Sequence, residues 1–150
     1  MKKIASFEVN HNVLQRGIYI SRVDGDITTY DIRMKLPNKD DYLGNAAMHT
    51  IEHIVATFVR NSGIKENIIY FGPMGCRTGF YLLVRNAEHS SVIELIRCAF
   101  EFLNRFEGEI PGVSAIECGN YLQHDLAEAK KEAKEYLPYI EKWSVEQLKY

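Results

Sequence analysis

Residues 45–61, NAAMHTIEHIVATFVRN, combine an apolar helical stripe with a cluster of potential metal ligands. The apolar side chains recur every three or four residues, which is typical of an amphipathic helix with one face in a core. We predict a helix that begins at Asn45, as its N-cap, and ends near Asn61, with Gly63 just beyond as a stop signal. The predicted core-facing positions are Ala47, Ile51, Ile54, Val55, Phe58 and Val59.

Two histidines lie off that stripe and four residues apart. On a helix, side chains at positions i and i+4 are about 5–6 Å apart at Cβ, so His49 and His53 can direct two imidazoles at one ion. Glu52 borders the same face and completes an H-x-x-E-H pattern, in which the glutamate is an acid/base beside the metal. The alternative is a polar helix face with two solvated histidines. We favour the metal site.

A third ligand must come from outside this helix, because catalytic zinc sites typically have three protein ligands and an open position. The residues alone leave the choice open among Cys76, Cys98, Cys118, His89, His124 and a carboxylate. Cys98 falls on the apolar stripe of a later helix, and we expect it to pack in the core. Cys76 and Cys118 each adjoin glycine, where the backbone can approach a ligand closely. We expect a capping or surface role for His89, and a surface position on a helix for His124.

The strands are predicted in pairs. Residues 16–23 and 27–36 are rich in β-branched and aromatic side chains and flank Asp-Gly-Asp, which favours a tight hairpin turn. Residues 67–71 and 79–84 read as two more strands.

Two further helices are predicted after the strands. Residues 90–106 follow an amphipathic pattern that a Ser91–Glu94 capping box opens. Residues 118–137 follow a second capping box, Ser114–Glu117, and are predicted to be helical until Pro138. Strands in hairpins, with helices between or after them, indicate an α+β fold in which an antiparallel sheet packs against helices. The candidate metal site would lie on the central helix.

Composition indicates an ordinary globular protein with one domain over residues 1–150. The formal net charge is −2, which gives no basic field for nucleic acid or an anionic membrane. Three cysteines cannot form a closed disulfide framework, so we expect a reducing compartment. The start, MKKIASFEVN, becomes polar before an apolar signal region develops, and no apolar run approaches a membrane span. We therefore expect a cytoplasmic protein.

Five motifs occur in an order that is specific to one family. They are SFEVNH (6–11), DIRMKLPNK (31–39), HTIEH (49–53), PMGCRTGFY (73–81) and ECGNYLQHDLAEAK (117–130). Together they resemble S-ribosylhomocysteine lyase, the LuxS family of bacterial autoinducer synthesis. The resemblance covers about residues 5–130.

The resemblance implies roles for particular side chains. His49, His53 and Cys118 would hold the metal, with water or substrate in the fourth position. Cys76 would be the catalytic cysteine, and Glu52 the second acid/base. The residues lining the ribosyl site would be Ser6, His11 and Arg33. Without the resemblance these three read as a turn residue, a structural histidine and a strand surface charge.

The resemblance also implies a reaction and an assembly. S-ribosylhomocysteine would be cleaved to homocysteine and a dihydroxypentanedione, the autoinducer precursor. A thioether leaves readily when it is β to a carbonyl, so the sugar carbonyl must first move along the chain by enolisations that need a Lewis acid and bases. The metal would be one divalent ion per subunit, Fe²⁺ in the cell with Zn²⁺ or Co²⁺ able to substitute. The family forms a homodimer whose active sites lie at the interface and use both chains.

Three other interpretations stay open. A small metal-dependent hydrolase would use Glu52 to activate a metal-bound water and would give Cys76 no role. A structural metal site would need a fourth protein ligand, for which Cys76 is a candidate. A family member with an altered substrate is suggested by Tyr70 and Gly72, which replace the aspartate and serine of the family's D-x-SPMGC. Asn10 likewise stands where the family usually has aspartate, and the loop between residues 33 and 49 is slightly longer than in the family.

Overall fold

The predicted hairpin is present and forms one side of an antiparallel sheet. The computed structural model describes residues 1–4 and 7–150. Within them, the strands are β1 (Gly17–Asp24), β2 (Ile27–Arg33), β3 (Ile68–Pro73) and β4 (Gly79–Arg85), in the order β1-β2-β4-β3. Asp24 pairs with Ile27, so the turn itself is Gly25-Asp26. Gly25 has a φ of 61°, a left-handed conformation that glycine adopts without strain.

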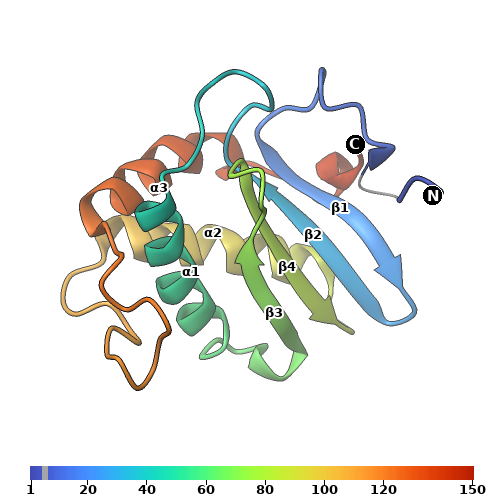
Figure 1. Cartoon of the computed structure of the whole chain (residues 1–150). Helices are drawn as coiled ribbons and strands as arrows, with labels where there is room; N and C mark the ends of the chain where they lie inside the picture. The colour runs from blue at the N-terminus through green and yellow to red at the C-terminus, as the bar shows by residue number, and fades with distance from the viewer. Residues whose placement is uncertain (5–6) are drawn as a thin grey trace.

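The helices gather on one side of this sheet. They are α1 (Asn45–Val59), α2 (His89–Arg105) and α3 (Leu126–Ile140), with 3₁₀ turns η2 (Lys65–Asn67) and η3 (Val145–Leu148). Figure 1 shows α2 passing behind the sheet with α1 and α3 beside it, and both chain ends beside β1. The predicted α+β class is confirmed. None of the helices in the described residues is long and apolar enough to cross a membrane.

The core lies between the sheet and the helices. Each strand sends alternate side chains into it, among them Ile18, Tyr30, Ile32, Phe71, Phe80 and Leu82. From α1 the predicted stripe is buried as expected, except that Phe58 is only half-buried. Thr50 is buried as well, at 0% exposure, although it is polar. A buried hydroxyl needs hydrogen-bond partners, and those of Thr50 lie at the candidate site.

The caps predicted for two helices are wrong, although α1 begins at Asn45 as expected. The N-cap of α1 is Gly44 rather than Asn45, and no side chain caps this end. The Ser91–Glu94 capping box does not form, because α2 begins earlier, at His89. The His89 ring bonds instead to the Tyr30 hydroxyl, with 2.5 Å between Nδ1 and Oη. This contact joins α2 to β2, which is distant in sequence, so a local capping pattern cannot predict it.

The third predicted helix begins too early and ends too soon. Residues 118–125 are not helical, and Asp125 is the true N-cap, accepting a hydrogen bond of 2.9 Å from the Glu128 N–H. The predicted Ser114–Glu117 box closes only a local turn. Pro138 lies inside α3, whose last turns are held by the buried Tyr136 hydroxyl donating to the Gly17 carbonyl at 2.7 Å. This packing offsets the backbone hydrogen bond that a proline removes.

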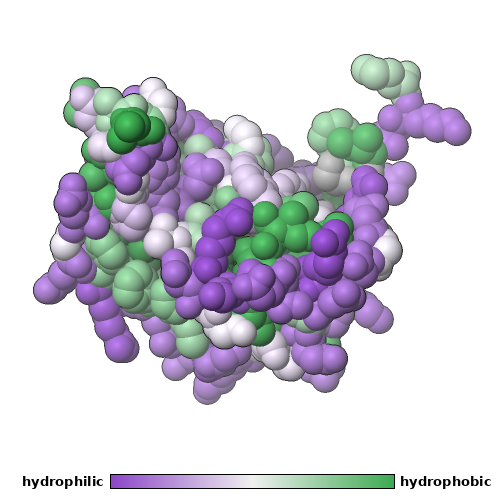
Figure 2. Space-filling view, turned by 90° about the horizontal axis from the view of Figure 1, so that it is seen from below, coloured by the Kyte–Doolittle hydropathy of each residue, from purple (hydrophilic) through white to green (hydrophobic). Residues whose placement is uncertain are grey.

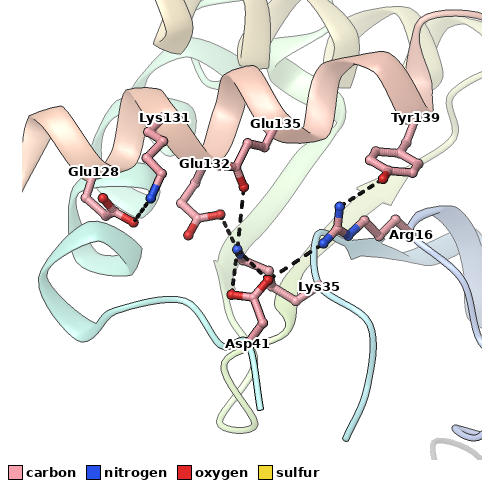
Figure 3. Close-up of polar contacts among 8 residues, drawn as sticks. All are labelled: Arg16, Lys35, Asp41, Glu128, Lys131, Glu132, Glu135 and Tyr139. Carbon is pink, nitrogen blue, oxygen red and sulfur yellow. Dashed lines mark hydrogen bonds and ion pairs between the residues drawn. The ribbon is translucent and has the colours of Figure 1, made fainter. Parts of the chain in front are cut away.

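An ion cluster with a buried pair at its centre ties the loop before α1 to α3 (Figure 3). The ammonium of Lys35 lies 2.7 Å from the Glu132 carboxylate, and both side chains are almost fully buried. Asp41 of the loop is 3.1 Å from the same nitrogen, and Glu135 is 3.9 Å away. Burial alone would lower the pKa of Lys35, but hydrogen bonds to Glu132 and Asp41 raise it, so the ammonium stays charged. The cluster fixes the chain that leads into α1.

Candidate metal centre and active site

Three of the predicted ligands come together where α1 meets the irregular segment 106–125. Ligand atoms of His49, His53 and Cys118 all lie within 4.8 Å of one another. The Cys118 Sγ atom is 3.4 Å from the His49 Nε2 atom. In a tetrahedral zinc site with ordinary bond lengths, nitrogen and sulfur ligands are about 3.5 Å apart. This donor set and spacing therefore fit a single divalent ion, and the ligand roles themselves stay predictions.

Backbone carbonyls of the same segment orient both imidazoles. The His49 Nδ1 atom is 2.9 Å from the Gln123 carbonyl oxygen, and the His53 Nδ1 atom is 2.6 Å from that of Pro111. A carbonyl can only accept, so each ring donates from Nδ1 and presents Nε2 as a lone-pair donor. Metal-ligating histidines usually have such a partner on the second ring nitrogen.

His124, one of the candidate third ligands, lies beside this cluster. Its ring stacks on His49 with 4.1 Å between centroids, but it lies outside the group of three. Its Nδ1 is 3.1 Å from the Thr50 hydroxyl, which also accepts the Asp125 N–H at 2.9 Å. Burial, with a contribution from His49 and His53, lowers the pKa of His124. His124 is half-buried and precedes α3, so the helical position expected for it is wrong. The role of Thr50 in supporting the site was not predicted from the sequence. Its position as a polar residue on the apolar stripe of α1 could have indicated a buried hydrogen bond.

The remaining candidate ligands are elsewhere. Cys98 is only half-buried on α2, with its thiol 3.4 Å from the Glu94 carboxylate, so the expected core position is wrong. His89 is engaged with Tyr30.

An open cavity of 510 Å³ adjoins the three ligands. Glu52 lines it from α1, and Ala56 and Thr57 continue the same helix face. Across from α1 the wall is made by Pro111 and the segment that leads to Cys118. Glu52 therefore borders the same open space as the three candidate ligands.

Cys76 lies on the connection between β3 and β4, within a polar chain of contacts. Its Sγ is 3.0 Å from the Thr78 hydroxyl, to which Arg33 donates at 2.6 Å. Arg33 is only 3% exposed, so its alternative interpretation as a surface charge is wrong. It forms an ion pair with Asp31, which is fully buried. Arg77, the cation next to Cys76 in sequence, instead lies over the ring of Tyr42.

Cys76 and the metal cluster lie apart within one chain. Figure 1 shows the β3–β4 connection beside the end of β2, whereas segment 106–125 is on the far side of α1. Cys76 is not among the described residues that line the metal cavity. His11 lies in the N-terminal segment, where its Nδ1 is 2.9 Å from the Val9 carbonyl oxygen. Ser6 falls outside the described residues.

Comparison with known proteins agrees with the motifs. The sequence model of the family described as S-Ribosylhomocysteinase (LuxS) matches residues 4–147. The chain belongs to the S-ribosylhomocysteinase (LuxS) family. 

Relatives named S-ribosylhomocysteine lyase match most or all of their length. The protein of Clostridium acetobutylicum is 47% identical over 156 aligned positions, covering 100% of this chain and 99% of the relative. That of Borreliella afzelii is 49% identical with the same coverage. That of Phocaeicola vulgatus is 50% identical over 143 positions, with 91% and 89% covered.

Two departures from the LuxS motif form one structural unit. Tyr70 and Gly72 are both on β3, and the phenol of Tyr70 lies over Gly72. A Cβ atom on Gly72 would be 2.0 Å from the Tyr70 hydroxyl oxygen. The serine that LuxS proteins usually have here would require this ring to move, so we expect the two replacements to be coupled. Asn10, the third departure, accepts the Asn12 N–H at 3.1 Å in a local turn.

Proposed function

We propose that this chain is a metal-dependent lyase that cleaves S-ribosylhomocysteine to homocysteine and a dihydroxypentanedione, the autoinducer precursor. The observation that carries the proposal is the cluster of His49, His53 and Cys118 beside the Glu52 carboxylate, in a chain of the LuxS family. Three ligands leave room for a substrate oxygen, whereas structural zinc sites are usually closed by four protein ligands.

The chemistry divides among the side chains. A divalent ion held by His49, His53 and Cys118 would supply a Lewis acid to the sugar oxygens. Glu52 and Cys76 are the proposed acid/base pair, which removes a proton from one carbon and returns one to the next. Once the carbonyl stands β to sulfur, loss of the adjacent proton breaks the C–S bond and homocysteine leaves as the thiol. The sequence is redox-neutral. We expect Fe²⁺ in the cell, with Zn²⁺ or Co²⁺ able to substitute.

Two copies of the chain would share each active site. Cys76 does not line its own chain's metal cavity in the described structure, so a second copy would have to bring it there. Ile116 and Leu122, on either side of Cys118, are 95% and 80% exposed. Figure 2 shows hydrophobic patches on an otherwise mainly hydrophilic face. Exposed apolar side chains next to an active site favour an interface there. His11 and Arg33, with Ser6, are the proposed ribosyl-binding residues.

The reaction is tested by release of free thiol from S-ribosylhomocysteine. Anaerobically purified, metal-loaded protein should release homocysteine, and the Cys76→Ala variant should not. No release from folded, metal-loaded wild type would overturn the proposal. Full activity in Cys76→Ala would favour a hydrolase in which Glu52 activates water.

The shared site is tested by mixing two inactive variants, Cys76→Ala and His53→Ala. If Cys76 and His53 of one site come from different chains, half of the sites in each mixed dimer are intact, and random exchange restores about a quarter of wild-type activity. A site contained in one chain would give no recovery.

The protein's cytoplasmic location is proposed as well, and the free state of all three cysteines, each among the described residues, supports a reducing compartment.

A further inference from the structure

Thr78 places a buried hydroxyl between a buried cation and the thiol of Cys76. Its side chain is only 3% exposed. Its backbone is fixed, because the Thr78 carbonyl accepts hydrogen bonds of 2.9 Å from the N–H groups of Met34 and Lys35. These bonds hold the backbone of Thr78 against the end of β2, where Arg33 lies.

The hydrogen-bond directions in this chain of contacts follow from chemistry. Arg33 can only donate, so the Thr78 oxygen accepts from it at 2.6 Å. The Thr78 hydroxyl proton is then free to point toward the Cys76 Sγ atom, 3.0 Å away. A thiolate can only accept, whereas a thiol would compete with this donor. The Cys76 sulfur therefore lies at the end of a chain of donors that begins at Arg33 and reaches it through the Thr78 hydroxyl.

Arg33 is itself held by a contact from the far end of the chain. Its partner Asp31 is fully buried, and one carboxylate oxygen, Oδ2, takes hydrogen bonds from both Arg33 and the Tyr150 hydroxyl, the latter at 2.7 Å. Tyr150 also stacks on Tyr19, with 5.0 Å between centroids. Burial and the charge of Asp31 raise the pKa of Tyr150, so its hydroxyl remains a donor. Because the Tyr150 hydroxyl and Arg33 share one oxygen of Asp31, this carboxylate neutralises the Arg33 charge less fully. More of that charge then acts on the Thr78 hydroxyl.

We infer that Thr78 is a positioning residue that passes the charge of Arg33 to the Cys76 sulfur, with Asp31 and Tyr150 holding Arg33 in place. The inference rests on the proposed function, because it explains how Cys76 is prepared for its acid/base role. It assigns roles to three side chains outside the catalytic and ligand sets, and one of them, Tyr150, is 72 residues beyond Thr78.

The test measures the sulfur directly and needs no substrate. Cys76 of the metal-loaded protein is alkylated with iodoacetamide at fixed neutral pH, and its rate is followed by peptide mass spectrometry with Cys98 as internal reference. Thr78→Val, which removes the hydroxyl at similar volume, should slow Cys76 alkylation about tenfold, since a charge-assisted hydrogen bond is lost. Thr78→Ser, which keeps the hydroxyl, should stay within about twofold of wild type. The Cys98 rate should not change.

A second variant keeps the test valid if Thr78→Val fails to fold. Tyr150→Phe retains the stacked ring and removes only the hydroxyl, and should slow Cys76 alkylation about threefold. Tyr139→Phe is the matched control, because among the described residues the hydroxyl of this exposed tyrosine bonds only Arg16. A wild-type rate in folded Thr78→Val would overturn the role of Thr78, and a wild-type rate in Tyr150→Phe would overturn that of Tyr150. Slowed alkylation in a protein that releases no homocysteine would support this inference and reject the proposed function.

Discussion

The Sγ atom of Cys118 lies 3.4 Å from the Nε2 atom of His49, although the two residues are 69 positions apart in the chain. Segment 106–125 folds back over α1 and supplies both this sulfur and the carbonyls that orient the imidazoles. The candidate metal centre is therefore a junction between a regular helix and an irregular segment. The segment must fold back over α1 to bring Cys118 to the histidines, and a bound ion would in turn hold the segment against α1.

Loss of the Cys118 sulfur should abolish metal binding. Only three protein ligands are close enough to share an ion among the described residues, and a thiolate is the strongest of them. We expect the metal content of Cys118→Ala, measured by inductively coupled plasma mass spectrometry after gel filtration, to fall from about one ion per chain to below about a tenth. Cys98→Ala is the control and should bind metal normally. Full metal content in Cys118→Ala would place the ion elsewhere.

Metal removal should loosen segment 106–125 while leaving α2 unaffected. This segment has no helix or strand of its own, so the ion would be one of its main attachments to α1. Hydrogen exchange measured by mass spectrometry should become faster over residues 112–124 after chelation. The buried face of α2 serves as the internal reference. Equal protection with and without metal would show that hydrogen bonds alone hold the segment.

Thr50→Val should destabilise the protein although it preserves volume. The Thr50 hydroxyl donates to the Ala46 carbonyl at 3.0 Å and accepts the Asp125 N–H at 2.9 Å. Valine leaves the Asp125 N–H without this partner, and we expect the free energy of unfolding to fall by about 1–3 kcal/mol in urea titrations. Thr57→Val on the same helix is the control. Within the part of the chain that the structure describes, its exposed hydroxyl bonds only the His53 carbonyl, and the change should be below about 0.5 kcal/mol.

Removing the Lys35 ammonium should make stability strongly pH-dependent. Burial raises the pKa of Glu132 above its ordinary value of 4.5, and Lys35 opposes that shift. In Lys35→Met burial acts unopposed, so the folded state holds the Glu132 proton more tightly than the unfolded state. The free energy of unfolding should then be highest below pH 4.5 and fall as pH rises through the raised pKa. At neutral pH we expect a loss of about 3–5 kcal/mol relative to wild type.

The matched control removes both charges of this pair. Lys35→Met combined with Glu132→Leu should recover most of the loss and flatten the pH dependence, because no unpaired carboxylate remains buried. A pH-independent loss in Lys35→Met would mean that packing of the lysine stem, rather than its charge, stabilises the loop.

The Tyr70–Gly72 pair should behave as one unit in a double-mutant cycle. Gly72→Ser adds a Cβ atom where the Tyr70 phenol lies, so the serine should destabilise the protein while tyrosine is present. With Tyr70→Asp the space is free and the same serine should be tolerated. We expect a coupling of about 0.5–3 kcal/mol in the free energies of unfolding. Additive effects would show that the ring moves aside without cost.

Local patterns along the chain were enough to predict much of this molecule. The α1 stripe, the β1–β2 hairpin and the paired histidines each depend on spacing within a few residues. The family motifs added Cys118, which spacing alone left among six kinds of candidate. Helix caps were less predictable: the Ser91–Glu94 pattern is a sound local signal, yet the N-cap of α2 is Glu88 and the neighbouring His89 bonds Tyr30 on β2.

Tertiary structure alone decided how the site is supported. No local pattern distinguishes a surface arginine from Arg33, whose burial depends on Asp31, Thr78 and a tyrosine at position 150. Likewise residues 118–125 were predicted to be helical but form an irregular segment, in which the Gln123 carbonyl and the Cys118 sulfur meet the imidazole of His49. Periodicity reports which face of an element is apolar. Which distant polar groups meet depends on how the elements pack, and that is settled only by the folded chain as a whole.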